Sequence, residues 1–357
     1  MKRFVIFLGI LVLLAGTAAG YTYQQYQQFL SKPLQLADDN TTFKIESGSN
    51  IRKVARQLAA ENILPASDIP YVKPEWLFIA HARITQQAGK IKAGEYALEE
   101  GMLPDDLLQR FVSGKTVQYQ ISFIEGRRFT DIFENVKSHP DLKHTLSEDD
   151  YADHELLMEK LGAPKGTYPE GWFFPDTYHF PKGTTDIDVL KRSYDTMVKY
   201  LNEAWETRKA HPHIKTPYEA LILASVVEKE TGVADERPLI AQVFLSRLEK
   251  GMMLQTDPTV IYGMGEEYDG NIRKKDLRKD TPYNTYTRTG LPPTPIATPG
   301  KAAIDAVFNP EETDALYFVA TGLGDGRHYF SKTYKEHREA VIKYQLNGKR
   351  SRYQGDK

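Results

Sequence analysis

The stretch Val226-Val227-Glu228-Lys229-Glu230-Thr231-Gly232-Val233 places two acidic residues where a strongly apolar helix ends. Upstream, Thr216-Pro217-Tyr218-Glu219 is typical of a helix start, with a hydroxyl N-cap, a proline in the first turn and a glutamate that closes a capping box. Residues 220–227 are apolar except for Ser225. We therefore expect a helix that is buried on nearly all sides and that ends at Gly232.

The two glutamates point to different faces of this helix, because two residues at 3.6 per turn are separated by about 200°. Glu230 stacks over apolar residues of the preceding turn, whereas Glu228 stacks over the small residues Ser225 and Ala224. Desolvation is expected to raise the pKa of Glu230 and to make it a proton donor near neutrality. The alternative is a frayed last turn that carries two solvated glutamates.

The amino terminus has the features of a membrane anchor. After Met1-Lys2-Arg3 the chain carries no charge until Lys32, and residues 4–23 supply the ~20 mainly apolar positions that cross a bilayer. Basic residues before the span and tyrosines after it favour a short cytoplasmic end and an exported remainder. The alternative is a cleaved signal peptide, because Thr17-Ala18-Ala19-Gly20 offers the small residues of a cleavage site.

Composition indicates a folded, globular chain and excludes some functions. The 357 residues are 41% hydrophobic and 11% aromatic, which suffices for two domains with cores after the anchor. No cysteine is present, so packing rather than disulfides must hold the exported part together. The net charge of -2 argues against a nucleic-acid partner. No nucleotide-binding loop occurs, and we expect neither a cofactor nor a metal, with His211-Pro212-His213 as surface sequence.

Three polar loops after residue 117 are candidates for substrate contacts. The first combines aromatic and acidic residues around Trp172, where sugar stacking and a role in the core stay open as alternatives. The second follows a helix over residues 236–250, and Asp257-Pro258 within it also fits a simple helix start. The third, residues 283–300, is rich in proline and tyrosine, as expected of a stiff groove wall. The candidate substrate-binding residues are Glu228, Gln255, Thr256, Asp257, Tyr262, Asn284, Tyr286 and Trp172.

With these motifs the chain resembles the YceG-like, MltG-type endolytic murein transglycosylases of bacteria. The resemblance is carried by the following segments: Glu125-Gly126, Glu170-Gly171-Trp172-Phe173-Phe174-Pro175-Asp176-Thr177, Glu228-Lys229-Glu230-Thr231, Leu254-Gln255-Thr256-Asp257-Pro258-Thr259-Val260-Ile261-Tyr262-Gly263, Tyr283-Asn284-Thr285-Tyr286 and Gly290-Leu291-Pro292-Pro293. It implies cleavage of the MurNAc-GlcNAc β-1,4 bond in peptidoglycan, with Glu230 as the catalytic acid/base and 1,6-anhydroMurNAc ends as product. It implies glycan strands as partner, with trimming or termination of nascent strands as the role and peptidoglycan synthases (penicillin-binding proteins) as candidate protein partners.

The resemblance also implies a division of the chain. We expect a cytoplasmic end over residues 1–3, a transmembrane anchor over 4–23, a stalk over 24–41, a LysM-like α+β module over 42–116, a larger α+β catalytic domain over 117–345 and a polar tail over 346–357. The expected location is the bacterial cytoplasmic (inner) membrane, crossed once, with the catalytic domain facing the periplasm or cell-wall space.

Two alternative functions stay open. One is a lysozyme-type peptidoglycan hydrolase that uses a second acid, Asp257 or Glu228, to activate water. The other is a cell-wall binding protein without activity. The products of sacculus digestion separate the three functions. Anhydro ends indicate a transglycosylase, reducing ends indicate a hydrolase, and the absence of released glycan indicates a binding protein.

Overall fold

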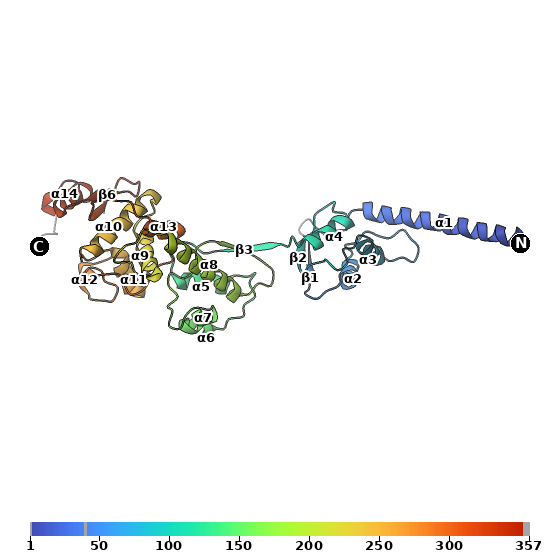
Figure 1. Ribbon diagram of the computed structural model, residues 1–357, viewed down its shortest axis with the longest axis horizontal. Helices are drawn as coiled ribbons and strands as arrows, with labels where there is room; N and C mark the ends of the chain where they lie inside the picture. Colours follow the sequence, from blue (N-terminus) through green and yellow to red (C-terminus); the bar gives the residue numbers. More distant parts are fainter. Residues whose placement is uncertain (1, 39–40, 353–357) are drawn as a thin grey trace. The chain divides into compact units, whose positions relative to one another are not determined.

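The computed structural model describes residues 2–38 and 41–352 and contains both helices and sheets, as predicted (Figure 1). The chain forms two compact units. Unit 1 consists of Met1–Tyr119 and His179–Lys182, and unit 2 consists of Gln120–Tyr178 and Gly183–Lys357. Strands β3 (Gln118–Ser122) and β4 (Thr177–Pro181) pair in a two-stranded sheet where the chain passes from one unit to the other.

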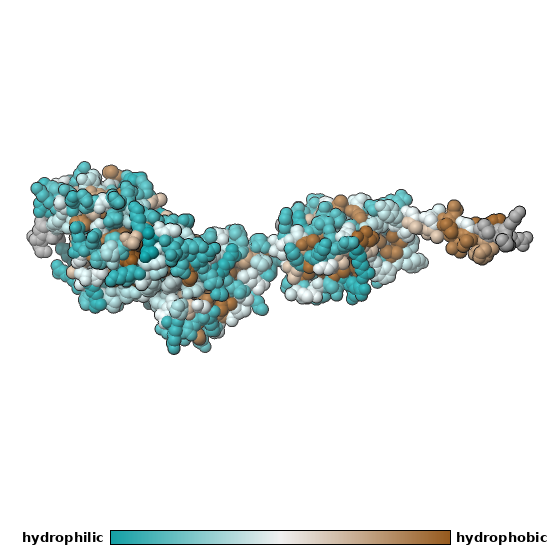
Figure 2. All heavy atoms as spheres, viewed as in Figure 1, coloured by the Kyte–Doolittle hydropathy of each residue, from teal (hydrophilic) through white to brown (hydrophobic). Residues whose placement is uncertain are grey.

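Helix α1 (Lys2–Ser31) begins unit 1. Its segment Ile6–Ser31 is long and apolar enough to cross a membrane, which fits an anchor or a signal sequence. Figure 2 shows apolar side chains exposed along the N-terminal part of this helix. The predicted stalk over residues 24–41 is corrected for its first part. Residues 24–31 continue helix α1, and Phe29 is only 2% exposed because it packs in the core of unit 1. Glutamines on the outer face gave this segment its polar composition.

The rest of unit 1 is a small α+β module. Strand β1 (Thr42–Ile45) pairs antiparallel with β2 (Gly94–Ala97), with Phe43 opposite Tyr96. Between the strands lie α2 (Ile51–Ala60) and α3 (Pro74–Ile84), which pack against each other, and α4 (Pro104–Ser113) follows β2. The core is closed by the rings of Phe43, Tyr96 and Phe111, because each sits on the inner face of its element.

Unit 2 is mainly helical. Its helices are α5 (Phe129–Ser138), α6 (Glu148–Ala152), α7 (His154–Lys160), α8 (Asp186–Thr207), α9 (Pro217–Glu230), α10 (Arg237–Glu249), α11 (Asp257–Met264), α12 (Lys274–Arg278), α13 (Lys301–Phe308) and α14 (Tyr334–Tyr344). The large apolar core of the unit is built from α8, α9, α10 and α13 with neighbouring segments. Strand β5 (Tyr317–Ala320) pairs antiparallel with β6 (His328–Ser331). The helices α10 and α13 pack on α9, which makes α9 the centre of the unit.

Helix α9 forms as its sequence predicts. Thr216 is the N-cap, its side chain accepts the Glu219 N–H, and the Glu219 side chain accepts from the backbone of Thr216. Every residue from 220 to 227 is buried, which confirms the prediction of a helix enclosed on all sides. The helix ends at Glu230, two residues before Gly232. Its last turn therefore carries both glutamates out of the core.

Candidate active site

A cavity of about 440 Å³ opens at the C-terminal end of α9. It lies between the end of α9, the loop before α11, Tyr286 of the 283–300 loop, strands β5 and β6, and helix α14. The lining residues are Glu230, Arg247, Leu254, Gln255, Thr256, Asp257, Tyr286, Tyr317, Phe318, Val319, Ala320, His328, Tyr334, His337, Val341 and Gln345. Among these, Glu230, Gln255, Thr256, Asp257 and Tyr286 were predicted as site residues from the sequence.

Glu230 and Asp257 are the two acids that line the cavity. The Thr256 hydroxyl donates a hydrogen bond to Oε1 of Glu230. Burial raises the pKa of Glu230, the Thr256 hydrogen bond opposes that rise, and the charge of Asp257 adds to it. The position of Glu230 at a helix C-terminus acts in the same direction, because the helix dipole disfavours negative charge there. The protonated form of Glu230 is therefore favoured relative to that of an exposed glutamate.

Thr256 reaches Glu230 because it does not cap its own helix. It occupies the N-cap position of α11, yet its side chain makes no capping hydrogen bond. The preceding Gln255 has a left-handed backbone, with φ of 51°, and this turn aims the loop at the end of α9. The loop is held by two bonds to Thr285, one from the Gln255 N–H to its carbonyl (3.1 Å) and one from the Thr256 N–H to its hydroxyl (3.1 Å).

Asp257 and Tyr286 join the two loops predicted to bind substrate. The Tyr286 hydroxyl donates to Oδ1 of Asp257 at 2.6 Å. Burial and the neighbouring Asp257 carboxylate raise the pKa of Tyr286, so its hydroxyl stays a donor at neutral pH. The simple helix start also predicted for Asp257-Pro258 is present, since these are the first two residues of α11. One segment thus both begins a helix and lines the cavity.

Asn284 lies in the interior of its loop and not on an open face. Its side chain is 1% exposed, and Nδ2 donates to the carbonyl oxygens of Leu277 (3.1 Å) and Lys279 (2.8 Å). Its Oδ1 accepts the Tyr286 N–H at 2.8 Å. The amide therefore spans the loop and positions Tyr286, and a direct contact of Asn284 with substrate stays a prediction.

Glu228 belongs to a different cluster, which confirms the prediction that the two glutamates point to different faces. Its Oε2 accepts the Gly300 N–H at 3.0 Å, and its Oε1 lies 3.4 Å from the Arg237 guanidinium. The neighbouring Lys229 ammonium donates to the Gly126 carbonyl at 3.1 Å. The Glu228 carboxylate thus fixes the 298–300 segment to α9, and it is not one of the groups that line the Glu230 cavity.

Tyr262 and Trp172 pack within unit 2, away from the lining of this cavity. The Tyr262 hydroxyl donates to Oε2 of Glu170 at 3.0 Å, and its ring meets Tyr283 edge-on. Trp172 stacks on Tyr218 with ring centroids 5.7 Å apart and an interplanar angle of 6°. Of the two roles left open for Trp172, the structure favours the core.

One wall of the cavity was not predicted from the sequence. It consists of aromatic and histidine side chains from β5, β6 and α14, including Tyr317, His328, Tyr334 and His337. The buried Glu236 carboxylate holds His328 through its backbone N–H and Nδ1, both at 2.9 Å. The available signal was the density of tyrosine and histidine over residues 317–337, which resembles that of the loops that were selected.

Arg247 is a second residue that sequence reasoning missed. Its guanidinium donates to the carbonyl oxygens of Leu316 (2.7 Å) and Leu254 (2.7 Å) and lies 5.1 Å from the ring centroid of Tyr317. It therefore ties the unpredicted wall to the loop that carries Gln255. Within residues 2–38 and 41–352, no group of three or more His, Asp or Glu side chains is placed to hold a metal ion.

Comparison with known proteins assigns the chain to a family. The model of the YceG-like family matches residues 43–343. The chain therefore belongs to the YceG-like family, and the resemblance noted in the sequence is confirmed. The matched residues include every candidate site residue and all of the cavity lining except Gln345.

Several relatives have curated names. The chain is 34% identical over 343 residues to the endolytic murein transglycosylase of Bacillus subtilis, with 89% of each chain covered. It is 29% identical over 376 residues to that of Streptococcus pneumoniae strain D39, covering 96% of this chain and 65% of the relative. A solved structure of a YceG-like protein from Listeria monocytogenes has 29% identity and a TM-score of 0.49, covering 85% of this chain and 99% of the other.

Proposed function

We propose that this chain is an endolytic murein transglycosylase that cleaves the MurNAc-GlcNAc β-1,4 bond with Glu230 as its acid and base. The enzyme class predicted from the resemblance, a lytic transglycosylase, is confirmed by the family and by the names of the relatives. The single observation that carries the assignment of Glu230 is its position, a buried carboxyl with a raised pKa that lines a cavity.

In the first step Glu230 acts as an acid. Its Oε1 accepts the Thr256 hydroxyl, which leaves Oε2 to carry the proton. That proton goes to the glycosidic oxygen as its bond to the muramic acid C1 breaks, and the N-acetylglucosamine side departs with a free 4-hydroxyl. The raised pKa favours the protonated form that this step needs.

In the second step the same group acts as a base. The 6-hydroxyl of the muramic acid attacks C1, forms the 1,6-anhydro bond and gives its proton to the Glu230 carboxylate. The acid is thereby restored without a second carboxylate. Water must be kept from C1 during this step, and the aromatic rings of Tyr286, Tyr317 and Tyr334 around the cavity support that requirement.

Hydrolysis is the second candidate function, and Asp257 is the carboxylate on which it depends. Asp257 lines the same cavity as Glu230. Its Oδ1 is engaged by the Tyr286 hydroxyl, so this oxygen is already occupied and is less available to bind an attacking water. Glu228 is held by Gly300 and Arg237, so it supports hydrolysis less than Asp257 does. These contacts favour the intramolecular route.

Mass spectrometry of purified sacculi digested by the full chain tests the proposal. Products with 1,6-anhydro ends are expected for wild type, and none for Glu230→Gln. Reducing ends from the wild-type protein would establish hydrolysis, and binding without release would establish a cell-wall binding protein. Retained glycan binding by Glu230→Gln separates loss of chemistry from loss of substrate.

We further propose that unit 1 contains a LysM-like module over residues 42–116 and that residues 117–345 form the catalytic domain. The strand, helix, helix, strand order of β1, α2, α3 and β2 supports the first assignment. Location of Glu230 and its cavity within unit 2 supports the second. Contacts with peptidoglycan synthases stay a prediction from the resemblance.

The proposed location is the bacterial inner membrane, crossed once by residues 4–23, with the catalytic domain in the periplasm or cell-wall space. The apolar segment of α1 supports an anchor. The insertion of Phe29 into the core of unit 1 adds support, because cleavage near Gly20 would leave a helix stub that is already part of the folded unit. Resistance to carbonate extraction, with Met1 as the first residue, is the expected result.

A further inference from the structure

A groove of about 480 Å³ lies between α2 and α3 of unit 1. Its floor is apolar, with Ile79 and Ala80, and its rim carries four cationic side chains and a tryptophan. The lining residues are Arg52, Arg56, Lys73, Glu75, Trp76, Ile79, Ala80 and Arg83. Arg52 and Arg56 are one turn apart on α2, so their guanidinium groups share one face of that helix.

The positive charge of this groove is not neutralised. Within the described part of the chain, Arg52, Arg56, Lys73 and Arg83 have no carboxylate within ion-pair distance, and Glu75 is the one acid in the lining. Unpaired cations that crowd one groove repel one another, which costs stability unless an anion binds there. The groove therefore has the charge of a site for anionic groups.

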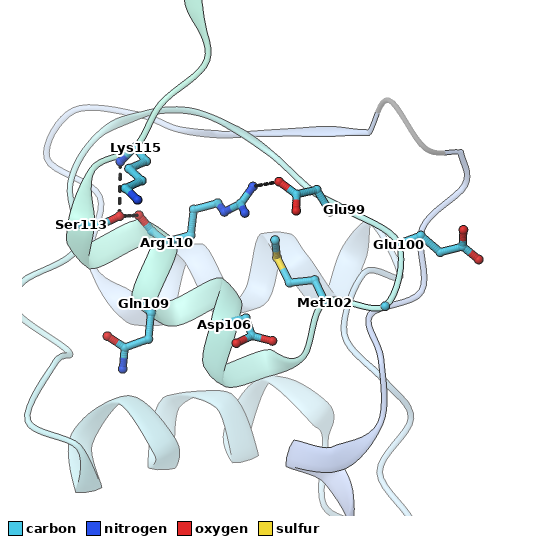
Figure 3. A pocket seen from close by; sticks show the side chains of 9 residues that line it. Glu99, Glu100, Met102, Asp106, Gln109, Arg110, Ser113 and Lys115 are labelled. Atoms are coloured by element: carbon cyan, nitrogen blue, oxygen red, sulfur yellow. Dashed lines mark hydrogen bonds and ion pairs between the residues drawn. The ribbon is translucent and has the colours of Figure 1, made fainter.

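A second hollow of unit 1 shows the contrast. It lies beside α4, measures about 570 Å³ and is drawn in Figure 3. Its Arg110 is paired with Glu99 at 2.6 Å, and Glu100 and Asp106 lie in the same lining. With Lys115, its lining holds three acids and two cations, so it has no excess of positive charge. Only the groove between α2 and α3, of these two hollows, presents an excess of cations.

Exposed aromatic side chains accompany the cations. Trp76 is 53% exposed on the rim, and Tyr71 is fully exposed at the tip of the loop between α2 and α3. Tyr71 also has a positive φ of 62°, an unfavourable conformation for a bulky residue. Tryptophan and tyrosine with one polar end are the residues that favour the interface between lipid and water. Folding alone gives no reason to hold Tyr71 outward in a strained turn.

Helix α3 and the loop before it are bonded to the C-terminal end of α1 and to the residue that follows it. Lys32, just after α1, forms an ion pair with Asp68 at 2.5 Å, in the loop that carries Tyr71. The Tyr26 hydroxyl and His81 Nδ1, on α1 and α3, are hydrogen-bonded at 2.7 Å. The element that bears the cations is therefore joined directly to the helix proposed as the anchor.

We propose that the groove between α2 and α3, with Tyr71 and Trp76, binds the anionic lipid headgroups of the membrane in which α1 is anchored. The inference rests on the anchor in the proposed function. Phosphate groups supply the negative charge that the four cations lack, and juxtamembrane cations are attracted by anionic lipid surfaces. The two aromatic rings lie at the headgroup level, where their apolar faces leave water.

A fluorescent label at position 71 tests this in the full chain. Because the protein has no cysteine, Tyr71→Cys gives one labelling site, and Glu100→Cys beside α4 gives a matched control. Each labelled chain is reconstituted into vesicles of phosphatidylcholine alone or mixed with phosphatidylglycerol. Acrylamide serves as quencher, since a neutral molecule is not repelled by anionic vesicles.

In the anionic vesicles only, the emission of the label at position 71 is expected to shift to shorter wavelength and to be quenched less by acrylamide. This change should vanish at 1 M salt, where charges are screened beyond about 3 Å. The label at 100 should respond to neither lipid. Equal emission of the Tyr71→Cys label in both vesicles, or a shift with soluble dextran sulfate but not with anionic vesicles, overturns the proposal.

Charge variants identify the groove as the cause. Arg56→Gln should reduce the lipid-dependent shift, and the double variant with Arg52→Gln should remove it. Lys53→Gln is the control on the same helix, because Lys53 is paired with Glu46 at 2.7 Å and lies outside the groove. A loss of the shift in Lys53→Gln as large as that in Arg56→Gln contradicts a specific groove.

Carbonate extraction of the same vesicles separates this inference from the anchor. A chain that resists extraction and shows no response at position 71 retains its anchor and disproves lipid binding by the groove. A chain that is extracted disproves the anchor, and the groove is then judged by flotation. Flotation with anionic vesicles but not with neutral ones supports it, and no flotation with either overturns it.

Discussion

Two buried carboxyls in unit 2, Glu230 and Glu170, have raised pKa values for the same reason and occupy different surroundings. Glu170 is 0% exposed, and burial raises its pKa to about 7. Its oxygens accept the Phe129 N–H and the Tyr262 hydroxyl, both at 3.0 Å. Glu230 instead borders a cavity and has the Thr256 hydroxyl as its hydrogen-bond partner.

The difference teaches that a perturbed pKa alone does not identify a catalytic acid. Phe129 is the first residue of α5, so Glu170 accepts a free N–H at a helix start and joins that helix to Tyr262 of α11. Both oxygens of Glu170 are used for this structural purpose. Glu230 keeps one oxygen for a ligand, and the space beside it is what makes the raised pKa useful.

The largest effect is expected for Glu230→Gln. The amide is nearly isosteric but cannot donate the proton, so glycan release should fall by about 10²–10⁴-fold, the usual contribution of a general acid. The melting temperature should stay close to that of wild type. Release of anhydro products is followed by mass spectrometry.

Glu228→Gln is the matched control for this loss. It leaves Arg237 buried with a weaker partner, so we expect lower stability with the chemistry retained. Equal loss of turnover in both variants, at a temperature where both are folded, contradicts the assignment of Glu230 as the acid.

The next effect is a pH dependence of stability due to Glu170. Its pKa is about 7 when folded and 4.5 as the ordinary value, so the folded state binds more protons between these limits. Stability due to this group is present below about pH 4.5 and is lost as pH rises toward 7, by about 3 kcal/mol at 1.36 kcal/mol per unit.

Urea unfolding of wild type and Glu170→Gln across pH 4.5–7.5 measures this contribution. As pH rises, the free energy of unfolding of wild type should fall relative to that of Glu170→Gln. Glu230 contributes with the same sign, so wild type minus variant isolates Glu170. Parallel curves for the two proteins contradict a buried, protonated Glu170.

A smaller effect is expected for Asn284→Ala. Loss of the buried amide removes its hydrogen bonds to the partly buried carbonyl oxygens of the 276–279 segment, at a cost of about 1–3 kcal/mol in the free energy of unfolding. Turnover should fall as well, because Tyr286 loses its backbone partner. Thermal melts beside release assays measure both, and an unchanged melting temperature contradicts the structural role.

The smallest change in stability is expected for Gln255→Ala. Its side chain is exposed at the cavity, so unfolding should change by less than about 0.5 kcal/mol. If Gln255 contacts the glycan, glycan release should decrease at the same time. Unchanged release would remove Gln255 from the substrate site and leave its turn as its only contribution.

Local rules predicted the parts of the site that depend on neighbours in sequence. Helix phase separated Glu228 from Glu230, and the capping box placed the start of α9, because both follow from 3.6 residues per turn. The loops at 254–257 and 283–286 were found from their polar and aromatic composition. In these cases the chemistry and the geometry lie within a few residues of each other.

The remaining features depend on contacts between distant residues. Asn284 could not be recognised as buried, since its partners are carbonyl oxygens of an earlier segment. The wall from β5, β6 and α14 is brought to Glu230 by tertiary packing alone. The predicted stalk was a misread local pattern, because Tyr26, Phe29 and Leu30 already recur at helical spacing among the glutamines.

Because α1 is continuous from its apolar segment into the core of unit 1, the two are locked in rotational phase. The six residue steps from Tyr23 to Phe29 rise about 9 Å along the helix, and the helix is unbroken between them. One alanine inserted between Gln24 and Gln25 would turn unit 1 by about 100° about the helix axis, whereas seven inserted residues would return it to within about 20°. The number of residues between the apolar segment of α1 and Phe29 therefore determines which side of unit 1 faces a given direction around the helix axis.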